Sequence, residues 1–210
     1  MALLNYFPER ISNLYFHGNR KDKKIALTFD DGPSKETERI LKILKENNSK
    51  ATFFIWGQRI RGREKIIKRI IKEGHEIGNH SYSHKRMAFK SKKFIEKEII
   101  KCDKELGVLG VKTDLFRPPK FSMGPNLLKT CKKLGKKIIL CDVISDDWKK
   151  PKIDLVLNKV LGETKKGSIV NFHDYLEGIG SNEQIVSVIN KSVPSLKDKY
   201  KLVTVSEILK

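Results

Sequence analysis

Segments with the pattern of buried strands alternate with amphipathic helical segments along most of this chain. Apolar, β-branched runs predict strands at 24–31, 51–57, 76–79, 115–117, 137–143, 168–173 and 201–205. Helices are predicted between them, after the N-cap residue Ser34 and at 64–73, 91–106, 125–134, 153–161 and 182–196. Such alternation favours parallel strands connected by crossover helices. We therefore predict an α/β protein built from β/α repeats.

Polar motifs follow five of these predicted strands at their carboxyl ends. In a barrel those ends converge on one mouth, whereas in an open sheet they are spread along an edge. A shared site thus favours a seven-stranded barrel, in a single domain that covers residues 24–210. Residues 1–23 are predicted to be an N-terminal extension that packs on the barrel.

The composition fits a soluble globular protein, with 39% hydrophobic and 33% charged residues. No apolar run reaches the roughly 18 residues that a membrane-spanning helix needs. The first ten residues show no cationic segment followed by a long apolar one, so no signal peptide is visible. The chain as given is expected in the cytoplasm, and the alternative is secretion or the cell surface if a leader is missing.

The formal net charge is +19, which comes mostly from lysine. One interpretation is attraction to anionic polymers. The other, which we favour, is a well-solvated lysine-rich surface, because the lysines are spread along the chain rather than clustered. No motif of interleaved basic and aromatic residues appears, so no specific nucleic-acid partner is expected.

The chain has three cysteines, Cys102, Cys131 and Cys141, in no CxxC spacing. An odd number without metal-ligand spacing argues against a disulfide framework. All three are expected to be small buried or half-buried residues.

Two motifs offer metal ligands. Asp30 and Asp31 end the first strand, and His80 and His84 lie four residues apart just after the third. One carboxylate and two imidazoles suit a catalytic divalent metal with open coordination positions, and the second carboxylate is then available as a general base for hydrolysis. Alternatively, Asp-Asp-Gly-Pro is only a turn signal and the histidines are an ordinary surface or core pair. His17 and His75 are interpreted as structural.

Three further motifs end later strands. Arg117 precedes two prolines, so its guanidinium is held where it can pair with a carboxylate. Asp147 and Trp148 place a carboxylate beside an aromatic wall, and His173 ends an apolar strand, where it can act as a general acid. Each motif also has a structural interpretation, such as a surface arginine before a turn.

Taken together, the five motifs resemble the polysaccharide deacetylases of the NodB-homology type, carbohydrate esterase family 4. The resemblance extends from Lys24 to Leu209, and it is most specific at Thr28–Gly32 and His80–His84. It implies a distorted (β/α)₇ barrel. It also implies a metal-dependent hydrolase that removes N-acetyl groups from N-acetylglucosamine-type glycans, such as chitooligosaccharides or peptidoglycan, and releases acetate.

The resemblance also implies a role for each motif. Asp31, His80 and His84 would bind one divalent metal, usually zinc, with cobalt, nickel, manganese or iron as alternatives. Asp30 would be the general base, and Arg117 would hold it in place and keep it ionised.

By the same resemblance, His173 would protonate the leaving amine and Asp147 would orient His173. The backbone N–H of Lys120 would donate to the oxyanion. Trp148 would form a wall of the substrate groove.

The chain departs from the family pattern at several substrate positions. Lys120 and Phe121 follow the two prolines, where relatives usually have an aromatic residue and then glycine. Asn171 replaces a leucine that helps to form the acetyl pocket, so a more polar pocket is expected. Ile144 stands where relatives often have aspartate. These departures bear on the substrate rather than on the metal ligands.

Three alternatives remain open at this stage. One is an amidohydrolase of a small or cyclic amide on the same barrel. Another is a glycan-binding or regulatory relative with weak or no catalysis, although Asp30 and His173 would then have no use. The third is a non-haem iron oxygenase, since two histidines and one carboxylate also suit Fe(II).

Overall fold

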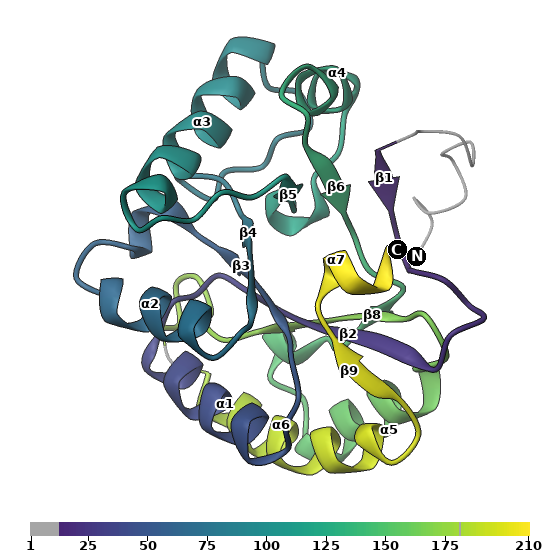
Figure 1. Cartoon of the computed structure of the whole chain (residues 1–210). Coiled ribbons are helices and arrows are strands. Elements are labelled where there is room, and N and C mark those ends of the chain that lie inside the picture. The colour runs from purple at the N-terminus through teal and green to yellow at the C-terminus, as the bar shows by residue number, and fades with distance from the viewer. Residues whose placement is uncertain (1–12, 181) are drawn as a thin grey trace.

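The computed structural model describes residues 13–180 and 182–210. Every paired strand in this part of the chain runs parallel to its neighbours, in the order β1-β6-β5-β4-β3-β2-β8-β7, with β9 paired to β2 (Figure 1). The strands are β1 Leu14–Tyr15, β2 Lys24–Asp30, β3 Thr52–Ile55, β4 Glu76–Asn79, β5 Leu115–Phe116, β6 Lys137–Ile139, β7 Val143–Ile144, β8 Ile169–His173 and β9 Lys201–Val203.

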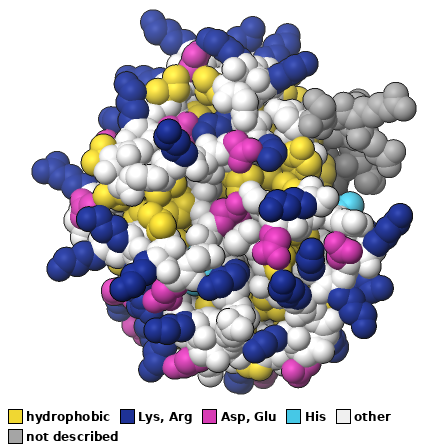
Figure 2. Space-filling view, in the orientation of Figure 1, with side chains coloured by type: hydrophobic (Ala, Val, Ile, Leu, Met, Phe, Trp, Pro, Cys, Tyr) yellow, Lys and Arg dark blue, Asp and Glu magenta, His cyan; other side chains and the backbone are white. Residues whose placement is uncertain are grey.

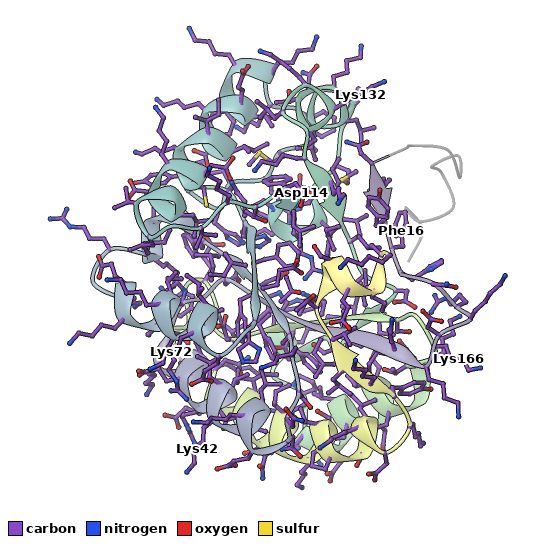
Figure 3. The ribbon with its side chains drawn as sticks, in the orientation of Figure 1. Phe16, Lys42, Lys72, Asp114, Lys132 and Lys166 are labelled. Carbon is purple, nitrogen blue, oxygen red and sulfur yellow. The ribbon has the colours of Figure 1, made fainter. Side chains whose placement is uncertain are left out.

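Helices α1 to α6 lie around the outside of the sheet, whereas α7 lies over its middle in the view of Figure 1. They are α1 Lys35–Glu46, α2 Glu64–Lys72, α3 Lys92–Val108, α4 Pro125–Lys133, α5 Ile153–Glu163, α6 Glu183–Lys197 and α7 Val205–Ile208. Helix α1 begins as predicted, because the Ser34 side chain accepts hydrogen bonds from the backbone N–H groups of Glu36 and Thr37. Side chains fill the space between helices and sheet, and the labelled Lys42, Lys72 and Lys132 lie at the periphery (Figure 3).

In strand β2, successive side chains point to opposite faces of the sheet, so one strand contributes both to the core and to the site. Its residues Ile25, Leu27 and Phe29 belong to the cluster that packs against the outer helices, and all three are fully buried. Burial of such side chains contributes about 1.5–3 kcal/mol each. Thr28 and Asp30 alternate with them and therefore point to the barrel interior, where Arg117 donates to both.

The strand predicted at 137–143 is in fact two strands, and this prediction was wrong. Strand β6 pairs with β5 and β1, whereas β7 pairs with β8 at the other end of the sheet. The break has a tertiary cause, because the carbonyl groups of Ile139 and Leu140 accept hydrogen bonds from Arg117. Strands β6 and β7 are therefore not hydrogen-bonded to each other, and the barrel is closed between them, at its seam, only by the connecting residues 140–142.

The architecture is the predicted distorted (β/α)₇ barrel in a single domain. Of the predicted extension, residues 1–12 lie outside the described residues, and β1 pairs with β6 in the remainder. Within residues 13–180 and 182–210, no helix is long and apolar enough to span a bilayer. The three cysteines are free and buried, as expected, and burial raises the pKa of the Cys131 and Cys141 thiols to about 12.

Candidate metal centre and active site

A cavity of about 450 Å³ opens at the carboxyl ends of the strands. It collects side chains from loops that are far apart in the sequence, as expected if the motifs share one mouth. Its lining residues are Asp30, Asp31, His80, His84, Arg86, Lys120, Phe121, Trp148, His173, Leu176, Glu177 and Ile179. His17 and His75 are not among them.

Asp31, His80 and His84 lie together at the base of this cavity. Asp31 Oδ1 is 3.3 Å from His80 Nε2 and 2.9 Å from His84 Nε2. One potential ligand atom from each of the three residues lies within 4.8 Å of the others, and all three residues are buried. Asp31 has a φ of 75°, the left-handed conformation that turns its carboxylate away from the β2 direction.

Gly32 continues this turn. A Cβ atom at Gly32 would lie 2.4 Å from Asp174 Oδ2, so only glycine fits there. The Asp31–Gly32 pair therefore lets the chain leave β2 sharply and leaves Asp30 and Asp31 at the same opening.

The donor set fits a divalent cation. His80 Nδ1 lies 2.8 Å from the carbonyl oxygen of Arg117, and a carbonyl can only accept, so in the neutral ring the proton is on Nδ1 and Nε2 carries a lone pair. That lone pair faces the buried Asp31 Oδ1, which has no hydrogen-bond donor. Two lone pairs at this distance are stabilised by a cation between them, and two imidazoles with one carboxylate match a catalytic metal site.

The charge of Asp31 is consistent with this arrangement. Burial opposes ionisation of its carboxyl group, whereas the imidazolium forms of His80 and His84, which donate to it, hold its pKa well below the usual range. A cation between the carboxylate and two neutral rings would supply the same positive charge. Asp31, His80 and His84, the three predicted ligands, therefore form a group that could bind a metal ion.

Asp30 lies beside the trio and is held from two sides. Arg117 Nη1 donates to Asp30 Oδ1 at 2.8 Å, and Asn171 Nδ2 donates to Asp30 Oδ2 at 2.8 Å. The Arg117 side chain is fully buried, and its other donors bind Thr28 and the Ile139 and Leu140 carbonyls. The carboxylate therefore has a fixed position in the wall of the cavity.

His173 and Asp147 form a second pair at the cavity. His173 Nδ1 is 2.8 Å from Asp147 Oδ1, and the His173 backbone N–H donates to Asp147 Oδ2 at 2.9 Å. Burial disfavours the imidazolium, but the charge and hydrogen bond of Asp147 overcome it and raise the pKa of His173 to about 10. Asp147 therefore favours the protonated form of His173.

The four residues predicted to contact substrate fall into two groups. Lys120, Phe121 and Trp148 line the cavity, and the Trp148 ring stands edge-on to His173 with 5.7 Å between centroids. Asn171 differs from the expectation, because it is fully buried behind Asp30 and does not line the cavity. It lies two residues before the end of β8, one layer deeper in the barrel than His173.

Five residues at the site were not predicted from the sequence, namely Arg86, Asp174, Leu176, Glu177 and Ile179. Glu177 contacts both His84 and Lys120, Arg86 lines the cavity, and Asp174 lies behind Gly32. Burial raises the pKa of Asp174 to about 7. Asp174 directly follows His173 and Arg86 lies two residues after His84, so their positions beside these motifs were usable signals. Glu177 lies in the loop after β8 and has no such signal.

Comparison with known proteins agrees with this geometry. Residues 17–139 match the sequence profile of the polysaccharide deacetylase family. The chain belongs to that family. It is similar to a peptidoglycan-N-acetylglucosamine deacetylase of Bacillus cereus, with 36% identity over 193 residues that cover 90% of this chain and 89% of the relative.

Solved structures of the polysaccharide deacetylase family share the whole fold. A peptidoglycan N-acetylglucosamine deacetylase crystallised with 4-naphthalen-1-yl-N-oxidanyl-benzamide matches with a TM-score of 0.89 and 36% identity, over 94% of this chain and 92% of that one. A pseudoenzyme of carbohydrate esterase family 4 from Bacillus anthracis matches with a TM-score of 0.86 and 27% identity, over 94% of this chain and 69% of that one. The family therefore contains both enzymes and a protein described as a pseudoenzyme, so the residues of the site decide between them.

Proposed function

We propose that this protein is a metal-dependent N-deacetylase that removes acetyl groups from N-acetylglucosamine-type glycans, such as chitooligosaccharides or peptidoglycan, and releases acetate. One observation carries the proposal. A spare carboxylate, Asp30, shares a cavity with the three candidate metal ligands and with His173, whose imidazole is paired with Asp147. Amide hydrolysis needs these parts together, namely a base, an electrophilic ion and an acid for the leaving nitrogen.

Asp31, His80 and His84 would hold the ion, which we propose is zinc, with cobalt, nickel, manganese or iron as alternatives. When bound, such an ion polarises the acetamido carbonyl group and makes a nearby water more acidic. Asp30 takes a proton from the attacking water. Arg117 and Asn171 hold the two oxygens of Asp30, so the base does not swing away during turnover.

His173 acts on the other side of the scissile bond. Asp147 occupies Nδ1, so the proton on Nε2 is the one available to the leaving amine. The backbone N–H of Lys120 is proposed as the oxyanion donor, and Lys120 is one of the residues that line the cavity. Trp148 and Phe121 supply apolar walls around the acetyl group and the sugar.

The experiment that tests the proposal is a direct assay of acetate. Purified protein is stripped of metal, reloaded with Zn²⁺ or Co²⁺, and incubated with chitooligosaccharides, peptidoglycan fragments and a set of cyclic amides. Acetate release from the N-acetylated glycans, dependent on the added metal, is the expected result. Turnover of the cyclic amides alone would favour the small-molecule amidohydrolase instead.

The pseudoenzyme relative makes a glycan-binding role the second candidate. The intact Asp30–Arg117 and His173–Asp147 pairs favour catalysis, because a binding protein has no need of a positioned base and a positioned acid in the same cavity as the candidate metal ligands. Glycan binding with no acetate release from any N-acetylated substrate would support the binding role.

The net charge suggests a further partner class. With +19 formal charges, attraction to anionic wall polymers is the alternative to the favoured interpretation of a well-solvated lysine-rich surface. The cytoplasmic location expected from the sequence, with secretion or the cell surface as its alternative, stays a prediction. Fractionation of cells that produce the protein tests it.

A further inference from the structure

Glu177 lies on the far side of a candidate metal ligand. Its Oε2 atom is 3.3 Å from His84 Nδ1 and 2.7 Å from Lys120 Nζ. These three residues come from three separate loops, after β4, β5 and β8. The carboxylate thus joins the segment 174–180 to two other sides of the cavity mouth.

The two candidate ligand histidines are held in different ways. His80 Nδ1 meets a backbone carbonyl at 2.8 Å, an acceptor fixed by the fold. His84 Nδ1 meets the Glu177 side chain, which is 43% exposed. A ligating histidine needs such an acceptor, because it fixes the tautomer, orients the ring and makes the ligating nitrogen more basic.

Within the part of the chain that the structure describes, no contact of His84 other than that with Glu177 supplies an acceptor for its Nδ1 proton. The His84 ring lies 4.7 Å, centroid to centroid, from the Trp56 ring, and Asp31 faces its Nε2 atom. Trp56 limits the tilt of the imidazole but accepts no proton from Nδ1. Among the described residues, the hydrogen bonds of His84 Nδ1 include only the one to Glu177.

Glu177 is placed to act through His84 rather than as a ligand. The group of mutually close ligand atoms consists of Asp31, His80 and His84, and Glu177 is not a member of it. It contacts the Nδ1 edge of the imidazole, whereas Asp31 contacts the Nε2 edge. A carboxylate on that outer edge is the arrangement of a carboxylate–histidine–metal relay.

Lys120 holds the carboxylate in this position. Its ammonium group is 2.7 Å from Glu177 Oε2, closer than His84 Nδ1 at 3.3 Å. The Lys120 backbone has the left-handed conformation, with a φ of 57°. The Lys120–Glu177 contact holds the Glu177 carboxylate next to His84 Nδ1.

We propose that Glu177 is a positioning residue for the metal ligand His84, and that Lys120 secures Glu177 across the cavity mouth. The proposal rests on metal binding by Asp31, His80 and His84, which is part of the proposed function, and it does not depend on which substrate is cleaved.

The test is the Zn²⁺ affinity of the full chain, measured without substrate by competition with a chromogenic chelator. Glu177→Ala is expected to raise the Zn²⁺ dissociation constant by about 10- to 100-fold, the usual effect of removing an outer partner of a ligand. Glu177→Gln keeps an amide oxygen and loses less. Lys120→Met weakens affinity in the same direction, by less than Glu177→Ala.

Glu96→Ala is the matched control, because Glu96 also pairs with a lysine, Lys133, at 2.8 Å but on the surface of α3 and α4. Its Zn²⁺ affinity is expected to equal that of the unmodified protein. A Glu177→Ala affinity within twofold of the unmodified protein, or a loss of the same size in Glu96→Ala, would overturn the proposal.

Two further readouts separate positioning from other roles. The Co²⁺ absorption spectrum of Glu177→Ala should keep the same coordination number, and a change in it would make Glu177 a ligand and overturn the proposal. The melting temperature of the metal-free variant should match that of the unmodified metal-free protein. A clear decrease would assign the affinity loss to loop folding and would also overturn it. None of these measurements uses acetate release. They therefore test the role of Glu177 even if the protein does not deacetylate glycans.

Discussion

At the scale of single residues, Arg117 connects the chemistry to the fold. Its fully buried guanidinium donates to Asp30 and Thr28 inside the barrel and to the Ile139 and Leu140 carbonyls at the seam. A lysine has three donors at one point and cannot reproduce this planar fork.

Arg117→Met should therefore be strongly destabilising. It leaves the buried Asp30 carboxylate without its cation and two carbonyl groups without a donor, and breaking a buried pair in this way costs about 3–5 kcal/mol. Urea unfolding measures the loss, and Arg117→Lys should recover less than half of it. A loss below about 1 kcal/mol would show that the pair contributes little to the fold.

The pH dependence of activity tests His173. Asp147 helps to raise the pKa of His173 to about 10, so the acid stays protonated through neutral pH and activity should decrease only at strongly alkaline pH. Asp147→Asn removes the charge that favours the imidazolium, so the alkaline limb of the kcat/KM profile should move to lower pH. An unmoved limb would remove His173 from the role of acid.

At the scale of elements, the sequence located strand ends well because local signals mark them. The Asp-Asp-Gly-Pro turn after β2 and the histidines after β4 are such signals, and the residues they mark do meet. The β6–β7 break was missed because it depends on a guanidinium from another strand. Glu177 was missed for the same kind of reason, since only the folded loop brings it to His84.

Helix α1 offers a prediction at this scale. The Ser34 hydroxyl accepts from the N–H groups of Glu36 and Thr37 and donates to the Asp174 carbonyl, which ties α1 to the loop after β8. Ser34→Ala should cost about 1–2 kcal/mol in urea unfolding, at the upper end for an N-cap. Ser91→Ala, at the exposed N-cap of α3 with one such bond, should cost less. Equal losses would show that the link to Asp174 adds nothing.

At the scale of the whole molecule, charge is the dominant surface property. Lys and Arg side chains are spread over the face in Figure 2, with Asp and Glu between them, rather than gathered in one patch. A distributed positive field steers anionic substrates toward the protein and is screened by salt.

The predicted consequence is a salt dependence that differs between substrates. Raising NaCl from 50 to 500 mM should reduce kcat/KM on an anionic wall polymer several-fold, as the Debye length decreases to a few ångströms, and should leave a neutral chitooligosaccharide nearly unaffected. The ratio of the two values across salt concentrations is the measurement. Parallel decreases on both substrates would attribute the effect to the enzyme itself and not to steering.

The most direct test of the account compares Asp30→Asn with His80→Ala. Zinc content and acetate release from a chitooligosaccharide are measured on the same samples of each variant and of the unmodified protein. Asp30→Asn is predicted to retain zinc and to lose at least about 100-fold in turnover, the contribution of a general base, whereas His80→Ala loses both zinc and turnover. An Asp30→Asn protein that keeps its zinc and releases acetate at the unmodified rate would contradict the account.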